Sequence, residues 1–162
     1  MRIAVITVSD RASKGVYEDR SGPAVEEVLS GLCPGAAIAR EIVPDEVAAI
    51  LAAFARHEGA DWILTTGGTG PAPRDVTPEA TLAFCDRELQ GLADYLRIES
   101  LRETPFAVFS RGRAGMRGRQ YVVNLPGSER AAGFCAALLG PLLEHGIDMA
   151  RGEGHEKPPR GG

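Results

Sequence analysis

Hydrophobic runs and helical repeats alternate along residues 1–65 of the chain. Residues 3–8, IAVITV, are rich in β-branched side chains, which is typical of a strand buried on both faces of a parallel sheet. Residues 38–43 and 62–65 have the composition of a second and a third strand. The pattern therefore predicts three strands in this part of the chain.

A helix is predicted in each interval between these strands. The first has Pro23 in its first turn, followed by apolar residues at helical spacing, and is expected to end at Gly31. The second covers the Ala-rich segment VAAILAAFARHEG and is expected to end at Gly59. Strands that alternate with helices favour right-handed crossover connections. The predicted fold class is therefore α/β, with a mostly parallel sheet covered by helices.

The middle of the chain has a more varied pattern. Thr77 is predicted to cap a helix that has Pro78 at its first position and Glu79 in its first turn. A further helix is predicted over ELQGLADYLRIESLR. The second half of the segment 106–127 is interpreted as a hairpin, with a strand at residues 121–125.

The C-terminal part is predicted to begin with a helix capped at Gly127 and Ser128. Pro141 lies inside this helical pattern and should kink the helix or split it in two. Residues 151–162, RGEGHEKPPRGG, lack apolar side chains and are expected to be disordered. Because chains divide into domains beyond about 250 residues, the prediction is a single domain over residues 1–150 and a tail.

Composition and charge argue against several classes of protein. Apolar residues make up 44% and charged residues 25% of the chain, as in ordinary globular proteins. The formal net charge of −4 argues against a nucleic-acid or anionic-membrane surface. No apolar stretch reaches the roughly 18 residues of a membrane span, and the N-terminus lacks the pattern of a signal peptide. We therefore expect a cytoplasmic protein without nucleic-acid or membrane partners.

The stretch TTGGTG, residues 65–70, follows the third predicted strand. Its glycines permit positive φ angles, and successive main-chain amides in such a loop can form a nest that binds an anion. A tight turn without a ligand would explain the same glycines. No Gly-Lys-Ser/Thr follows, as a P-loop requires, and Pro73 stands where the third glycine of a dinucleotide fingerprint would be. The loop is a candidate phosphate site of neither standard kind.

Two aspartates lie in the loops after predicted strands. Asp45 follows the second strand, and Asp75 lies between the glycine loop and the next helix. Because ligands bind at the carboxyl ends of strands in open α/β sheets, these carboxylates could hold Mg²⁺ together with substrate phosphates. Asp45 could instead cap the helix that follows it, and Asp75 could pair with Arg74 or Arg87.

Other charged and polar residues allow two interpretations each. The arginines of the segment 111–119 could form an electropositive rim for a polyphosphate, or could lie on a solvated hairpin; they are Arg111, Arg113, Arg117 and Arg119. Asp10 and Asp19 fit turn positions, and Ser128 could cap the last helix or face an anion. The histidines fit no metal spacing, and no arrangement supports a covalent nucleophile.

Longer motifs carry a resemblance to a known family. The segments VSDRASKGVYEDRSGP, PDE, LTTGGTGPAPRDVTPEAT, Ser110-Arg111 and VVNLPGS together closely resemble the molybdopterin adenylyltransferases, a family that includes the corresponding domain of gephyrin. The resemblance covers the chain to about residue 150. It implies a three-layer αβα sandwich, usually assembled as a homotrimer, that acts in molybdenum cofactor biosynthesis.

The resemblance also implies a reaction and a site. In the family, the terminal phosphate of molybdopterin attacks the α-phosphorus of ATP with Mg²⁺ as the metal, giving adenylyl-molybdopterin and pyrophosphate. Asp45 and Asp75 match the two essential acids, and Asp75 is the expected Mg²⁺ ligand. The other matching positions form the phosphate loop and pocket: Ser9, Asp10, Thr66, Gly67, Gly68, Thr69, Gly70, Ser110, Asn124, Pro126, Gly127 and Ser128. A molybdenum-inserting protein is a further candidate partner.

Two other functions fit parts of the sequence. A non-catalytic molybdopterin carrier could hold a phosphate with the same loop, but carboxylates beside an anion give a simple phosphate holder no advantage, so Asp45 and Asp75 favour the enzyme. A nicotinamide-dependent oxidoreductase is disfavoured by the missing third glycine.

Overall fold

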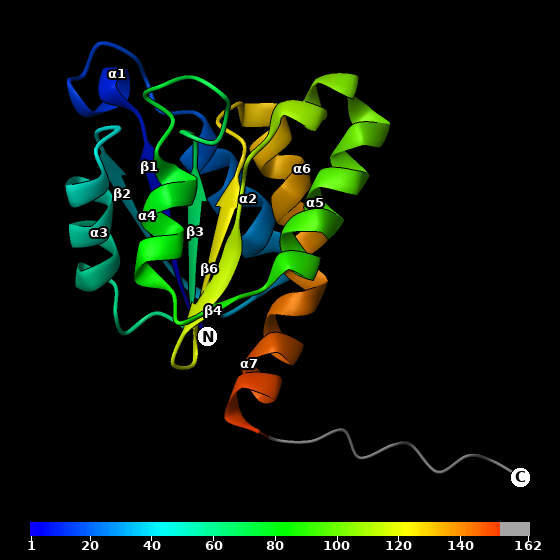
Figure 1. Ribbon diagram of the computed structural model, residues 1–162. Coiled ribbons are helices and arrows are strands. Elements are labelled where there is room, and N and C mark those ends of the chain that lie inside the picture. The colour runs from blue at the N-terminus through cyan, green and yellow to red at the C-terminus, as the bar shows by residue number, and fades with distance from the viewer. Residues whose placement is uncertain (153–162) are drawn as a thin grey trace, which may run out of the picture.

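The computed structural model describes residues 1–152 and contains one six-stranded sheet (Figure 1). The strands are β1 (Arg2–Val8), β2 (Ala37–Val43), β3 (Trp62–Thr66), β4 (Arg87–Glu88), β5 (Ala114–Arg117) and β6 (Gln120–Leu125). They lie in the order β2-β1-β3-β6-β5-β4. β2, β1, β3 and β6 are parallel, whereas β5 and β4 are added antiparallel. The predicted mostly parallel sheet and the hairpin are confirmed.

Helices cover both faces of this sheet. One face packs against α3 (Val47–Arg56) and α4 (Thr77–Phe84) (Figure 1). The other face packs against α2 (Ser21–Leu32), α5 (Gln90–Glu103), α6 (Glu129–Leu139) and α7 (Leu143–Arg151). The shorter elements are α1 (Asp10–Ser13), η1 (Pro105–Phe109) and η2 (Gly140–Leu142). The three-layer sandwich is confirmed, and no helix within residues 1–152 is long and apolar enough to cross a membrane.

Alternate side chains of β1 enter two separate cores. Ile3 and Val5 pack with the core beneath α2 and α6, whereas Ala4 and Ile6 pack with the core beneath α3 and α4. All four side chains are buried. A strand covered on both faces needs apolar residues at successive positions, which explains the uninterrupted run in the sequence.

Trp62, at the start of β3, anchors the C-terminal helix. Its ring stacks on Tyr121 of β6 with the ring centroids 3.9 Å apart. Its Nε1 donates a hydrogen bond to the carbonyl oxygen of Leu143 at 3.2 Å. Gly146 of α7 lies against the indole, because a Cβ at that position would come within 2.6 Å of the ring. These contacts lie at the opposite end of β3 from the glycine loop.

The register of the parallel strands brings four strand ends to one edge of the sheet. Val8 pairs with Val43, Thr7 pairs with Thr66, and Thr66 pairs with Leu125. The loops that follow β1, β2, β3 and β6 therefore begin side by side. These are the loops that contain the motifs SDRAS, PDE, TTGGTG and NLPGS.

Three predicted helix boundaries are wrong. α2 continues through Gly31 to Leu32, and α3 ends at Arg56, before Gly59. Neither glycine has the positive φ angle with which glycine ends many helices. Thr77 is the first residue of α4 and does not cap it, because its hydroxyl donates to the carbonyl oxygen of Gly67 at 2.9 Å.

The C-terminal predictions agree better with the structure. Ser128 caps α6, and Pro141 lies in the 3-10 turn η2, which separates α6 from α7. α7 ends at Arg151, one residue into the predicted tail. Residues 153–162 of that tail lie outside the described residues.

Candidate active site

The glycine loop passes very close to the end of β1. Gly67 and Gly68 have φ angles of +90° and +62°. A Cβ at Gly67 would lie 2.5 Å from the carbonyl oxygen of Val8, so only glycine fits this position without strain. The amide of Gly67 donates to the carbonyl oxygen of Leu125 at 3.2 Å, which ties the loop to β6 as well. Glycine is therefore required here for backbone geometry, independently of any ligand.

Asp45 is joined to the loop after β1 by two hydrogen bonds. The amide of Asp10 donates to Asp45 Oδ2 at 2.7 Å, and the amide of Asp45 donates to Asp10 Oδ1 at 3.2 Å. Asp45 Oδ1 lies 3.2 Å from the position that a Cβ on Gly68 would take. The carboxylate faces the glycine loop, and the N-cap of α3 is the neighbouring Glu46. Asp45 thus does not serve as the helix cap.

The Asp45 carboxyl lies in an electrostatically unfavourable place for a negative charge. Burial raises the pKa of Asp45 above its usual value, and the charges of Asp10 and Asp75 raise it further. The hydrogen bond from the Asp10 amide acts in the opposite direction. A half-buried acid held against two other acids is typical of a site that binds a cation or handles a proton.

Asp10 forms an ion pair with Arg74. Arg74 Nε donates to Asp10 Oδ2 at 3.1 Å, and Arg74 Nη2 donates to the same oxygen. The hydrogen bond from Arg74 lowers the pKa of Asp10, so this carboxyl stays ionised. Arg74 therefore pairs with Asp10 across a sequence separation of 64 residues, which local sequence reasoning about Asp75 does not anticipate.

Asp75 lies in a tight turn of the long segment after β3. Its amide donates to the carbonyl oxygen of Ala72 at 2.9 Å, and its Oδ2 accepts from the amide of Ala72 at 3.0 Å. The same oxygen lies 2.8 Å from the position of a Cβ on Gly70. Asp75 thus faces Gly70, while Asp45 faces Gly68. The structure brings the two predicted acids to the same short loop.

Two predicted serines have local structural roles. Ser9 Oγ accepts from the amide of Ala12 at 3.2 Å and caps α1. Ser128 Oγ accepts from the amide of Ala131 at 3.4 Å and caps α6. Both residues lie at the site edge of the sheet, and in these bonds their hydroxyl oxygens act as acceptors.

Asn124 is built into the sheet edge. It is 5% exposed, and its Nδ2 donates to the hydroxyls of Thr65 and Thr81 at 3.0 and 2.8 Å. Its Oδ1 accepts from the amide of Arg113 at 3.0 Å. This predicted site residue therefore braces the ends of β3 and β6 and presents little of its side chain to a ligand.

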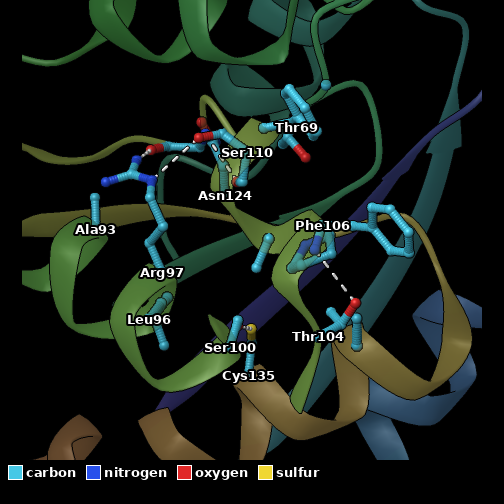
Figure 2. Close-up of a pocket in the computed structure, with 16 residues that line it drawn as sticks. Thr69, Ala93, Leu96, Arg97, Ser100, Thr104, Phe106, Ser110, Asn124 and Cys135 are labelled. Carbon is cyan, nitrogen blue, oxygen red and sulfur yellow. Dashed lines mark hydrogen bonds between the residues drawn. The ribbon is translucent and has the colours of Figure 1, made fainter. Parts of the chain in front are cut away.

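Two cavities lie beside the glycine loop. The first has a volume of about 270 Å³ and includes five predicted residues, namely Thr69, Gly70, Ser110, Asn124 and Pro126. Figure 2 shows it between the loop and side chains of α5 and η1. The second has a volume of about 320 Å³ and includes five others, namely Ser9, Thr66, Gly67, Gly127 and Ser128. Ten of the twelve predicted pocket residues are thus divided between two cavities, and Asp10 and Gly68 line neither of them.

The second cavity also contains a hydroxyl network around Asp19. Thr7 Oγ1 donates to Asp19 Oδ2 at 2.8 Å, and the amide of Gly22 donates to Asp19 Oδ1 at 3.1 Å. Ser21 Oγ lies 3.2 Å from Asp19 Oδ1 and 2.8 Å from Thr66 Oγ1. Sequence reasoning assigned Asp19 to a turn. The sequence does contain a signal for this role. Asp19 lies three residues before Gly22 in the first turn of α2, and this spacing is typical of an Asp that caps a helix.

Three of the four arginines of the segment 111–119 have separate partners, namely Arg111, Arg113 and Arg117. Arg113 Nη1 donates to Glu88 at 2.8 Å, and the guanidinium of Arg117 lies over the ring of Phe84. Arg111 contacts the glycine loop directly, through its amide to the carbonyl oxygen of Thr69 at 2.8 Å. These contacts do not favour a continuous electropositive rim.

Comparisons with known proteins agree with this architecture. Residues 4–145 match a family model described as a probable molybdopterin binding domain. Over 156 residues the chain is 41% identical to a molybdopterin adenylyltransferase of Helicobacter pylori strain J99, covering 94% of this chain and 89% of that protein. The molybdopterin adenylyltransferase of Escherichia coli K12 is 43% identical over 135 residues, which is 81% of this chain and 69% of that protein.

A solved structure supports the same assignment. The molybdopterin biosynthesis enzyme MoaB of Thermus thermophilus superposes with a TM-score of 0.84 at 44% identity, covering 93% of this chain and 96% of that one. The fold, the motifs at the strand ends and the relatives therefore all indicate the same family. The chain belongs to the molybdopterin-binding family that includes the molybdopterin adenylyltransferases.

Proposed function

We propose that this protein transfers the adenylyl group of ATP to the terminal phosphate of molybdopterin and releases pyrophosphate. The observation that carries the proposal is the placement of Asp45 and Asp75 against Gly68 and Gly70 of one loop. A carrier that only held a phosphate would gain nothing from two carboxylates there, whereas a nucleotidyl transfer that uses a metal ion needs carboxylate oxygens to hold that ion beside the phosphates. The names of the relatives supply the identity of the substrates.

The reaction requires positioning and charge neutralisation more than covalent chemistry. An oxygen of the molybdopterin phosphate forms a bond to the α-phosphorus of ATP. The bond between the α-phosphorus and the oxygen that bridges it to the β-phosphorus breaks. Pyrophosphate leaves with the electron pair of that bond. No protein nucleophile is needed. The amides that follow Gly67 in the loop are the proposed donors to the phosphate oxygens, since the amide of Gly67 itself is bonded to Leu125.

The acids of the site fit Mg²⁺. This ion takes hard oxygen ligands, commonly one or two carboxylates plus substrate phosphates. Burial raises the pKa of Asp45 most and the charges of Asp10 and Asp75 add to it, and a divalent cation nearby would offset both effects. Within residues 1–152 no group of three or more His, Cys, Asp or Glu side chains is arranged to hold a metal ion by itself.

We assign different roles to the two acids. Asp75 binds or orients the Mg²⁺·ATP complex, and Asp45 organises the pterin or its phosphate. When bound, Mg²⁺ would neutralise charge on the phosphate oxygens. The residues themselves supply the carboxylate oxygens, the loop amides and the shape of the two cavities.

A direct assay tests the proposed function. The purified protein is mixed with molybdopterin, ATP and Mg²⁺, and pyrophosphate and adenylyl-molybdopterin are measured together. We expect both products in equal amounts. Binding of molybdopterin without release of pyrophosphate would favour the carrier function.

We further propose that the chain assembles as a homotrimer through an apolar surface at the end of α5 and in η1. Ile98, Phe106, Val108 and Phe109 are each more than half exposed there. Such a patch is typical of an interface. Light scattering should give the mass of a trimer for the wild type and a lower mass for Phe106→Glu, and a monomeric wild type would contradict the proposal. A cytoplasmic location and a molybdenum-inserting partner stay predictions.

A further inference from the structure

Arg111 donates hydrogen bonds to three main-chain carbonyl oxygens, two in the glycine loop and one in the turn that follows it. Its amide donates to the carbonyl oxygen of Thr69 at 2.8 Å. Its Nε donates to the carbonyl oxygen of Gly70 at 2.8 Å, and its Nη2 donates to the carbonyl oxygen of Asp75 at 2.5 Å. Asp75 ends the turn that begins at Ala72, and Gly70 lies two residues before that turn. One guanidinium therefore spans that turn.

The position of the Asp75 carboxylate depends on the shape of this turn. Asp75 Oδ2 accepts from the amide of Ala72, which belongs to the same turn. Its approach to Gly70 is close, because a Cβ there would lie 2.8 Å from this oxygen. The carboxylate is thus fixed relative to its own loop, and the loop is fixed to the rest of the domain in part through Arg111.

Arg111 is itself held in place. Its Nη1 donates to Glu79 Oε1 at 2.5 Å, and Nη2 lies 3.4 Å from Glu79 Oε2. The pKa of Glu79 is lowered chiefly by this hydrogen bond, so Glu79 remains ionised beside the guanidinium. Glu79 lies in the first turn of α4, which is packed against the sheet.

A second arginine fixes the segment that carries Arg111. Figure 2 shows Arg97 extending from α5 toward Ser110. Its Nε donates to the carbonyl oxygen of Ser110 and its Nη2 to that of Gly112, both at 3.0 Å. The residues on either side of Arg111 are therefore tied to α5. Arg97 of α5 thus holds the main chain on either side of Arg111, and Glu79 of α4 holds its guanidinium.

The geometry leaves Arg111 little capacity to bind a substrate. A guanidinium has five N–H donors, and the contacts with Gly70, Asp75 and Glu79 use four of them. A bidentate phosphate contact needs two donors in one plane. The expectation that Arg111 belongs to a phosphate-binding rim does not fit this arrangement.

We propose that Arg111 is a positioning residue that clamps the glycine loop and so places the Asp75 carboxylate, without contacting the substrate phosphates. The inference rests on the proposed function for its effect on turnover. The clamp itself is a property of the free protein and can be tested without substrates.

Arg111→Lys, Glu79→Gln and Arg113→Lys form a matched set for this test. Lysine keeps the charge but cannot bridge two carbonyl oxygens as a planar fork does. Arg113 is the control, because it lies two residues away, is similarly exposed, and has a side-chain contact with Glu88 on the surface. Thermal unfolding of each variant shows whether it is folded before its kinetics are compared.

The kinetic outcomes separate a clamp from a phosphate ligand. A clamp predicts that Arg111→Lys lowers kcat about tenfold to a hundredfold while KM for ATP changes less than about twofold, because the acid is displaced by a fraction of an ångström. Glu79→Gln should lower kcat by a smaller factor, and Arg113→Lys should match the wild type. A raised KM for ATP with unchanged kcat in Arg111→Lys would overturn the proposal. A lowered KM for ATP in Glu79→Gln would also overturn it, because it would mean that Arg111 binds the phosphates once Glu79 no longer holds it.

Hydrogen exchange gives a readout that is independent of catalysis. The amides of Ala72 and Asp75, which are both hydrogen-bonded within the turn, should exchange faster in Arg111→Lys than in the wild type, whereas Arg113→Lys should leave them unchanged. Equal protection in Arg111→Lys and the wild type would overturn the clamp. If the wild type releases no pyrophosphate, the proposed function fails, and the exchange data still decide whether Arg111 holds the loop.

Discussion

The two aspartates of the site are held by different means. Asp45 lies two residues beyond the end of β2, and its carboxylate accepts from the amide of Asp10, which lies two residues beyond β1. β1 and β2 are paired up to Val8 and Val43, so the sheet itself sets the distance between these loops. Asp75 lies nine residues beyond β3, in a segment held by contacts such as those from Arg111.

The difference shows that one site can combine two kinds of support. The position of Asp45 follows from strand pairing, which involves many cooperative main-chain bonds. The position of Asp75 depends on a few side chains around an exposed loop, where local opening costs less free energy. Substitutions in the Asp75 half should therefore affect activity more than stability.

The largest effect is expected for Asp75→Asn. The amide keeps the size of the side chain and an oxygen that can accept from the amide of Ala72, but it removes the charge proposed to hold Mg²⁺·ATP. We expect turnover to fall about a hundredfold or more, which corresponds to roughly 2.7 kcal/mol of transition-state stabilisation. Pyrophosphate release measures this, with Asp148→Asn as a control at an exposed position of α7. Full activity in Asp75→Asn would remove this residue from the mechanism.

Gly67→Ala should disturb the part of the site that strand pairing positions, where the glycine loop packs against the end of β1. The new Cβ would approach the main-chain oxygen of Val8, and alanine is strained at the positive φ angle of Gly67. We expect a loss of about 3 kcal/mol in the free energy of unfolding, or roughly 6–12 °C in Tm. Thermal denaturation of the variant gives the value. An unchanged Tm would mean that the loop can move away from β1 without cost.

Gly70→Ala should instead disturb the part of the site around Asp75, which is held by side-chain contacts. Gly70 does not have a positive φ angle, and its new Cβ would meet the movable carboxylate of Asp75 at 2.8 Å. The carboxylate should move, so we expect kcat to fall about tenfold while Tm changes by less than about 2 °C. Kinetics and thermal unfolding of the same sample test this contrast with Gly67→Ala. A large loss of Tm with normal kcat would reverse the comparison.

The smallest expected effect is a gain of stability in Asp45→Asn. Because the pKa of Asp45 is raised in the folded state, its carboxyl favours folding when protonated, and that contribution is lost as pH rises through the folded-state pKa. Replacing the acid with an amide removes the penalty at neutral pH. We expect Tm to rise by about 1–2 °C at pH 7, since solvent screens part of the effect, and the gain to vanish near pH 3. A lower Tm at pH 7 would show that ionised Asp45 supports the fold.

The parts of the fold that bury long apolar runs could be predicted from the sequence. β1 and β3 are recognisable because both of their faces are covered. α1 and β4, of four and two residues, are too short to show a period. The helix ends expected at Gly31 and Gly59 are wrong because neither glycine adopts the left-handed conformation with which Gly152 caps α7.

The candidate site could be predicted only in part, for a related reason. The convergence of strand ends in a parallel sheet is general, so Asp45 and the glycine loop could be expected to meet. The contacts of Arg111 are with main-chain carbonyl oxygens 41 and 36 residues away, and carbonyl groups leave no signature in the sequence. The pairing of Arg74 with Asp10 is equally non-local.

The packing of Trp62 gives the protein an internal optical reporter. It is the sole tryptophan of the chain, it is 2% exposed, and it lies at the end of β3 that is remote from the glycine loop. Its fluorescence should therefore change when α7 detaches or the domain unfolds, and should stay constant when ATP or a pterin binds. The tryptophan signal can thus report the stability of the fold in the presence of ligands without reporting their binding.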